Sequence, residues 1–223
     1  MDEFSKVEST SLSAFPIAKA GYPFIGAAAI TTIILAILGL KFLTLFALVV
    51  TFFICFFFRD PDRYIPEKND AVVSPADGRV ILAEKVDKNP FLDGECIKVS
   101  IFMNIFNVHV NRIPFSGTIE KIKYHPGKFF TANLDKASKD NEQNALLLDI
   151  EGGKRICFVQ IAGLVARRII CYVNEGDRVK RGQRFGLICF GSRLDVYLPS
   201  ETKINVSVGD RVNAGTSILG YLT

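Results

Sequence analysis

Hydrophobic and polar positions divide the chain into three stretches. Residues 1–23 are polar and rich in small residues, and Pro16 and Pro23 disfavour a continuous helix there. Residues 24–58 are apolar, with Lys41 as their only charge. From residue 59 onwards, short runs of alternating apolar and polar residues are separated by turn sequences. The pattern predicts a polar leading segment, a membrane segment over 24–58 and a β domain over 59–223.

The apolar stretch predicts a helical hairpin. Gly39 and Lys41 divide it into halves of about 17 residues, and a helix of that length spans roughly 25 Å, just short of a hydrocarbon core. One continuous helix would exceed the core. Lysines before the hairpin and Arg59 and Arg63 after it place both ends in the cytoplasm. The run is too long for the core of a cleaved signal peptide, and a buried soluble helix is the alternative.

Beyond a linker rich in Pro and Asp (59–68), β-branched and aromatic runs predict short strands. Asp-Gly, Pro-Gly, Gly-Gly and Glu-Gly turns lie between them. A helix or loop is expected around 133–144. The predicted strands are 79–84, 95–102, 155–161, 169–173, 193–198 and 203–206.

A short repeat refines the expected fold. The sequence GDRVKRG at 176–182 returns as GDRVNAG at 209–215, an offset of 33 residues. Each copy is a tight turn that leads into a short strand. The pattern resembles biotinyl and lipoyl carrier domains, so we expect a mainly β fold: a lipoyl/biotinyl-like β-sandwich (barrel-sandwich hybrid) with an N-terminal hydrophobic helical hairpin.

Composition excludes several classes of protein. The five cysteines are odd in number and lack Cys-x-x-Cys spacing, so neither a disulfide framework nor a structural zinc site is indicated. With only two histidines, a three-histidine metal site is impossible, and we expect no metal. The net charge of +4 is modest and forms no basic stripe, so nucleic acid is not expected as a partner.

Three segments place polar groups in apolar strand or turn contexts. They are SPADG at 74–78, FNVHVNRIP at 106–114 and FGSRLD at 190–195. Each alone has an ordinary explanation, because Pro-Ala-Asp-Gly is a good turn, a histidine on an alternating strand is often half-buried, and Gly-Ser is a common loop pair. Their combination carries the functional prediction.

Four ordered segments of the β domain have distinctive sequences: SPADGRV at 74–80, FMNIFNVHVNRIPFSG at 102–117, YHPGKFFTANLDKASKDNEQN at 124–144 and FGSRLDVYL at 190–198. Together they resemble the short bacterial and archaeal form of phosphatidylserine decarboxylase. The resemblance covers the chain from about residue 60 to its end, and the hairpin agrees with it.

The resemblance implies a self-processing proenzyme. Amino-acid decarboxylation needs an electron sink conjugated to the substrate nitrogen, which no ordinary side chain provides. The family makes a pyruvoyl group from a serine, without pyridoxal phosphate or metal. By resemblance, Ser192 Oγ attacks the carbonyl of Gly191, and elimination and hydrolysis leave a keto group that forms a Schiff base with the substrate amine. The cut yields a β chain, 1–191, and an α chain, 192–223.

The same resemblance suggests roles for three further residues. A serine hydroxyl needs a base, for which His109 is the candidate, and Asp77 would orient the imidazole in a Ser-His-Asp arrangement. Gly191, without a Cβ, permits the close approach of the hydroxyl. His109 is also the expected acid that protonates the α-carbon after decarboxylation.

Substrate contacts are expected from the family-like stretches. Asn141, Glu142 and Asn144 are candidates for the head-group pocket. Long-form relatives carry a second histidine three residues after the first, where this chain has Arg112, which we assign to substrate binding as well. His125 is more typical of a surface turn than of a phosphate contact.

The predicted function is decarboxylation of phosphatidylserine to phosphatidylethanolamine at the inner cell membrane, with the catalytic domain on the cytoplasmic side. The two cleavage products are expected to form a heterodimer, and any higher oligomer is left open. The alternative is a non-enzymatic membrane adaptor or carrier with a lipoyl-like domain, motivated by the repeat, the hairpin and Lys136. An all-β metallopeptidase would need more histidines.

Overall fold

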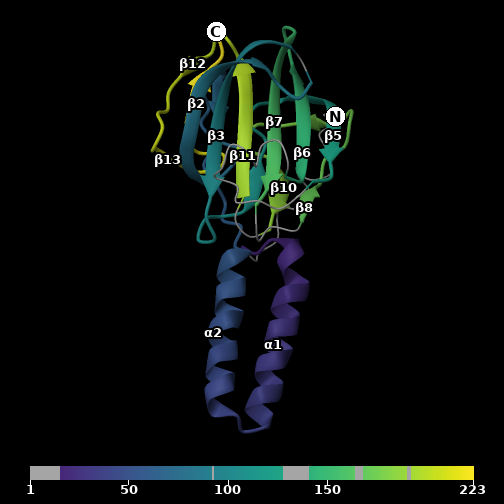
Figure 1. Ribbon diagram of the computed structural model, residues 1–223, viewed down its shortest axis with the longest axis vertical. Helices are drawn as coiled ribbons and strands as arrows, with labels where there is room; N and C mark the ends of the chain where they lie inside the picture. The colour runs from purple at the N-terminus through teal and green to yellow at the C-terminus, as the bar shows by residue number, and fades with distance from the viewer. Residues whose placement is uncertain (1–15, 92, 128–140, 164–167, 190–191) are drawn as a thin grey trace. The chain divides into compact units, whose positions relative to one another are not determined.

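The computed structural model describes residues 16–91, 93–127, 141–163, 168–189 and 192–223 (Figure 1). These residues form two compact units, residues 16–62 and residues 63–223.

The first unit is a pair of apolar helices. A 3-10 turn, η2 (Lys19–Gly21), leads into α1 (Tyr22–Ile37), and α2 (Lys41–Phe57) follows after a three-residue reversal. Gly39 makes the reversal at a φ of 71°, which favours glycine. Pro23 lies in the first turn of α1, where a missing N–H breaks no helical hydrogen bond, so the helix begins before the predicted residue 24.

The helices satisfy their polar groups internally and expose apolar side chains. Thr32 and Thr51 each donate to the carbonyl four residues earlier, and their hydroxyls lie 3.1 Å apart between the helices. Large apolar residues such as Phe42 and Ile37 are exposed. By length and composition, the helical stretch Lys19–Ile37 could cross a bilayer, whereas α2 is shorter.

The second unit is mainly β, as predicted, and all its pairings are antiparallel. An eight-stranded sheet, which curls in Figure 1, has the order β13-β2-β3-β11-β7-β6-β5-β9, and two three-stranded sheets have the orders β1-β14-β12 and β4-β10-β8. The strands are β1 (Ala71–Val73), β2 (Gly78–Lys88), β3 (Asp93–Met103), β4 (Val110–Arg112), β5 (Gly117–His125), β6 (Gln143–Ile150), β7 (Lys154–Ala162), β8 (Ile169–Cys171), β9 (Arg178–Val179), β10 (Arg184–Ile188), β11 (Ser192–Pro199), β12 (Lys203–Ile204), β13 (Arg211–Val212) and β14 (Ile218–Tyr221).

The large sheet is buried on both faces near its centre. On β6, Leu146 and Leu148 belong to the main core, whereas Ala145 and Leu147 belong to a second apolar cluster. Because side chains alternate between the faces of a strand, these two sets lie on opposite faces. Burial on both faces gives β6 a continuous apolar run without alternation, which explains why it was not predicted.

Every predicted strand overlaps an observed one. The predicted helix or loop at 133–144 differs at its end, because Gln143 and Asn144 begin β6 and pair with β5. Residues 128–140 lie outside the described part of the chain.

The two copies of the repeat occupy equivalent positions against the strands. In each copy, the N–H of the first glycine donates to the carbonyl of a strand residue. The N–H of that same strand residue donates to the carbonyl of the aspartate that follows the glycine, and all four distances lie between 2.8 and 2.9 Å. The strand residues are Ile119 for the first copy and Val80 for the second. Each copy then adds a two-residue strand, β9 beside β5 and β13 beside β2.

Replacement of the last glycine of the first copy should destabilise the β unit. Gly182 has a φ of 80°, and an added Cβ would lie 2.3 Å from Ile65 Cδ1. We expect Gly182→Ala to cost about 2–4 kcal/mol of unfolding free energy, from backbone strain plus overpacking. Gly176→Ala, with a φ of 87° but open space around the new methyl group, should cost only about 1–2 kcal/mol. Urea denaturation of the two variants measures the difference, and equal losses would contradict packing against Ile65.

Candidate active site

Two predicted site segments are joined by reciprocal backbone hydrogen bonds. The Arg112 N–H donates to the Pro75 carbonyl, and the Val73 N–H donates to the Pro114 carbonyl, both at 2.9 Å. The SPADG turn and the strand after His109 therefore lie side by side, although they are more than thirty residues apart in the sequence.

The two repeat turns form backbone hydrogen bonds with the SPADG turn and with the strand after His109. In each case one residue of the segment exchanges two backbone hydrogen bonds of 2.7–2.8 Å with the end of a repeat copy. Ser74 pairs in this way with Gly215 and Ser217, and Ile113 pairs with Gly182 and Gln183. The pseudo-symmetric scaffold thus positions the site.

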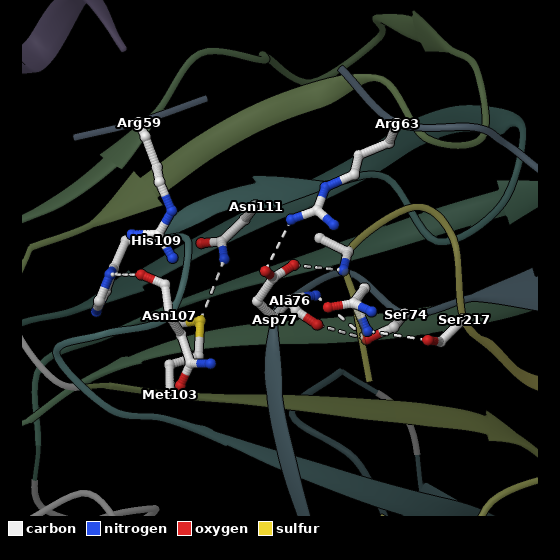
Figure 2. A network of polar contacts seen from close by, with 12 residues as sticks. Arg59, Arg63, Ser74, Ala76, Asp77, Met103, Asn107, His109, Asn111 and Ser217 are labelled. Atoms are coloured by element: carbon white, nitrogen blue, oxygen red, sulfur yellow. Dashed lines mark hydrogen bonds and ion pairs between the residues drawn. The ribbon is translucent and has the colours of Figure 1, made fainter. Parts of the chain in front are cut away.

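Asp77 is held in a buried turn. Its Oδ1 accepts a hydrogen bond from the Ala214 N–H at 2.7 Å, and its Oδ2 forms an ion pair with Arg63 at 2.8 Å (Figure 2). Ser74 Oγ closes the turn by donating to the Ala76 carbonyl at 2.7 Å. Both carboxylate oxygens of Asp77 thus have partners in the scaffold, and its predicted action on the imidazole of His109 stays a prediction.

His109 is fully buried immediately before β4. Its Nδ1 lies 2.9 Å from the carbonyl oxygen of Asn107 (Figure 2). Because a carbonyl oxygen only accepts hydrogen bonds, Nδ1 must carry the proton, and Nε2 of the neutral ring keeps its lone pair. The contact therefore selects the tautomer in which Nε2 is the basic nitrogen.

Ser192 is the first residue of the central strand β11. It pairs with Met103 on β3 and Ala162 on β7 and is fully buried. Its hydroxyl has no hydrogen-bond partner among the described residues. A buried hydroxyl normally finds a partner, so one that does not is a candidate for chemistry. Gly191, on the other side of the predicted cleavage site, lies outside the described residues.

Two predicted substrate residues contact the strand partner of Ser192. Asn141 Nδ2 donates to the Ala162 carbonyl at 2.7 Å, and the Ala162 N–H donates to the Glu142 carbonyl at 2.9 Å. Asn141 is fully buried and Glu142 nearly so. The structure therefore brings both to the end of the sheet at which Ser192 lies.

Asn144 belongs to a buried amide relay that the sequence did not predict. Its Nδ2 donates to Gln160 Oε1 at 3.1 Å, and Gln160 Nε2 donates to Asn111 Oδ1 at 2.9 Å. Asn111 Nδ2 in turn lies 3.8 Å from the sulfur of Met103, the strand partner of Ser192. Since Asn111 lies two residues after His109, the relay connects β6 and β7 to the histidine strand. A glutamine in the apolar run ICFVQIA was the available signal.

The opposite face of β11 carries a buried ionic cluster. Arg193 donates to both oxygens of Asp195, at 2.6 and 3.2 Å, and to Ser100 on β3 at 2.8 Å. Lys98 lies 3.1 Å from the same carboxylate. These contacts fasten the strand that begins with Ser192 to β3.

The remaining candidates have other surroundings. Arg112 Nη1 donates to the Gly182 carbonyl at 2.9 Å, so its guanidinium supports a repeat turn, and its predicted contact with substrate stays a prediction. His125 is exposed at the end of β5, and Lys136 lies outside the described residues.

Other nucleophiles are less suited to chemistry. Burial raises the pKa of the thiols of Cys96, Cys157, Cys171 and Cys189, so they stay protonated and weakly nucleophilic near neutral pH. Within the described part of the chain, no three His, Cys, Asp or Glu side chains cluster as metal ligands.

Comparisons with known proteins give the family to which this chain is similar. A family model described as phosphatidylserine decarboxylase matches residues 50–220. Relatives named phosphatidylserine decarboxylase proenzyme include one from Desulfotalea psychrophila, 50% identical over 93% of this chain and 97% of its own. Those from Syntrophus aciditrophicus and Geotalea uraniireducens are 54% and 52% identical, over 92% and 93% of this chain and 96% and 97% of their own.

Removal of the central amide of the relay should destabilise the β unit. Gln160→Leu leaves Asn111 Oδ1 and Asn144 Nδ2 buried without their partner, which should cost roughly 2–5 kcal/mol of unfolding free energy. Asn205→Leu removes only an exposed contact of 3.4 Å and should change stability by less than about 0.5 kcal/mol. Denaturation curves of both variants make the comparison, and a neutral Gln160→Leu would refute the importance of the relay.

Proposed function

Because the chain belongs to the phosphatidylserine decarboxylase family, we propose that it decarboxylates phosphatidylserine to phosphatidylethanolamine after cutting its own backbone between Gly191 and Ser192. The observation that carries this proposal is the buried Ser192 hydroxyl, which has no hydrogen-bond partner among the described residues. Inside a protein, where the effective dielectric constant is lower than in water, an unpaired hydroxyl interacts more strongly with a reaction partner.

The self-cleavage needs only groups of the chain and one water molecule. Ser192 Oγ bonds to the carbonyl carbon of Gly191 as the peptide C–N bond breaks, and the hydroxyl proton passes by way of His109 Nε2 to the released nitrogen of residue 192. Loss of the α-proton of residue 192 then breaks the Cβ–O bond and releases Gly191 as a carboxylate. The resulting dehydroalanine tautomerises to an imine, and one water hydrolyses it, so that a keto group remains and ammonia is released. The tautomer selected by Asn107 supports His109 as the base.

The surroundings of Ser192 fit a pyruvoyl group. A small keto amide at the start of β11 would lie between Met103 and Ala162, in the space that the serine side chain occupies. Its carbonyl would withdraw electrons from the substrate amine as carbon dioxide leaves. We assign Asn141, Glu142, Asn144 and Arg112 to the head-group pocket and His109 to protonation of the α-carbon.

The two products of the cut would stay together as a heterodimer. The 32 residues from Ser192 to Thr223 contain β11 to β14. β11 is central in the large sheet, and β13 and β14 pair with β2 and β1 of the longer chain. Backbone ladders would therefore replace the lost covalent link.

The quasi-equivalent repeat turns support the finer proposal of a lipoyl/biotinyl-like β-sandwich. The apolar helices, with their internally bonded threonines, support attachment to the inner cell membrane. The basic residues that flank them in sequence favour a catalytic unit on the cytoplasmic side.

The Ser192→Ala variant should remain a single uncut chain, because it lacks the nucleophile. The parent protein should show two chains on a denaturing gel, and intact mass should give a 192–223 fragment with a blocked N-terminus. Borohydride trapping with phosphatidylserine should add mass to the small chain only. The Ser200→Ala variant, at a partly exposed position after β11, is the control and should be cut normally, whereas efficient cutting of Ser192→Ala would refute the proposal.

The two histidines of the chain provide a second test. His109→Gln should slow self-cleavage by about 10²–10⁴-fold, the usual contribution of a positioned base. His125→Gln, at an exposed position on β5, should be processed at the parent rate. The fraction cut with time after synthesis measures both variants, and equal rates would remove His109 from this role.

A further inference from the structure

The loop between β3 and β4 presents two large apolar side chains to solvent. Ile105 and Phe106 are 39% and 61% exposed. They follow Met103, which pairs with Ser192, and precede His109. Because β3 and β11 are antiparallel, the end of β3 and the start of β11 lie at the same end of the sheet, visible in Figure 1. The apolar tip therefore lies at the end of the β unit that carries the site.

Polar contacts within the loop hold this tip in place. Asn107 Oδ1 accepts from the Asn104 N–H, and Asn104 Oδ1 accepts from the Phe106 N–H, both at 2.9 Å. The Asn107 N–H also donates to the Asn104 carbonyl at 3.0 Å. The turn is thus held by its own hydrogen bonds, while part of the Ile105 side chain and most of the Phe106 side chain stay exposed. Because the hydrogen bonds fix the turn, its exposed apolar side chains already have the conformation in which they could contact an external apolar partner.

The charges of this end suit a lipid surface. Residues 103–109 contain no Asp, Glu, Lys or Arg. Arg168 is exposed, and its carbonyl accepts a hydrogen bond from the Cys189 N–H, while the neighbouring Ile188 N–H contacts the His109 carbonyl. An uncharged apolar tip with a cation at the same end of the unit matches the boundary between acyl chains and anionic head groups.

We propose that Ile105 and Phe106 insert into the acyl and head-group boundary of the bilayer, where they dock the active-site end of the β unit onto the lipid surface. This inference rests on the proposed function, because a bilayer lipid as substrate makes the membrane the expected partner. The Asn107 carbonyl that orients His109 belongs to the same loop, so docking and the histidine share one structural element.

The experiment uses the absence of tryptophan from the chain. Phe106→Trp introduces a single reporter in the loop, and Val208→Trp introduces one at a matched exposure of 63%, between β12 and β13. Both full-length variants, combined with Ser192→Ala, are reconstituted into vesicles of phosphatidylglycerol and phosphatidylethanolamine. Some lipids carry a nitroxide quencher near the glycerol end of the acyl chain.

The emission of Phe106→Trp should shift to shorter wavelength and be strongly quenched, while that of Val208→Trp should do neither. A Phe106→Trp signal as unquenched as the control, or equal quenching of both, would overturn the inference. Because the Ser192→Ala background removes turnover, the quenching result does not depend on decarboxylation, and failure of the proposed function would show only in the processing and trapping assays. In the processed enzyme, Phe106→Ser should lower the decarboxylation rate on vesicles about tenfold, from lost apolar burial.

Discussion

The structure depends on the reciprocal backbone pairing between residues 73–75 and 112–114. This pairing brings together the turn that carries Asp77 and the strand that follows His109, and each segment is closed on its outer side by one copy of the repeat. Glycines with positive φ let both repeat turns approach the linker residue Ile65 closely. The duplicated turn is thus a structural device that assembles a site from segments distant in sequence.

Around this scaffold the site is built mainly from neutral amides. Asn141, Asn144, Gln160 and Asn111 bond to one another or to backbone next to the strand partners of Ser192, and ionic groups lie in the turn of Asp77 and on the far face of β11. Such a network fixes geometry through neutral hydrogen-bonding groups. A reaction that moves a proton from serine to histidine and then releases a carboxylate would benefit from an environment that is polar but rigid.

Sequence patterns predicted much of this arrangement. Alternating strands such as 95–102 and 193–198 and the glycine repeat indicated the mainly β class, which the structure confirms. The family-like segments indicated Ser192, His109 and Asp77 as site residues, and these roles stay predictions. Doubly buried strands lack alternation, so β6 was missed. The partners of Asp77 and the carbonyl that binds His109 depend on tertiary contacts, and a single glutamine within an apolar run did not reveal the amide relay.

The central position of β11 also affects how the protein can fold before the proposed cut and refold after it. A precursor that is cut only after folding, as proposed above, folds as one polypeptide, so its central strand needs only to find its place within its own chain. Once the backbone is cut, a denatured mature protein would have to recover that strand from a separate fragment at a concentration-dependent rate. Before the cut, the folded state would be reached reversibly. After the cut, it would persist because the barrier to unfolding is high, and an unfolded enzyme molecule would not reassemble readily.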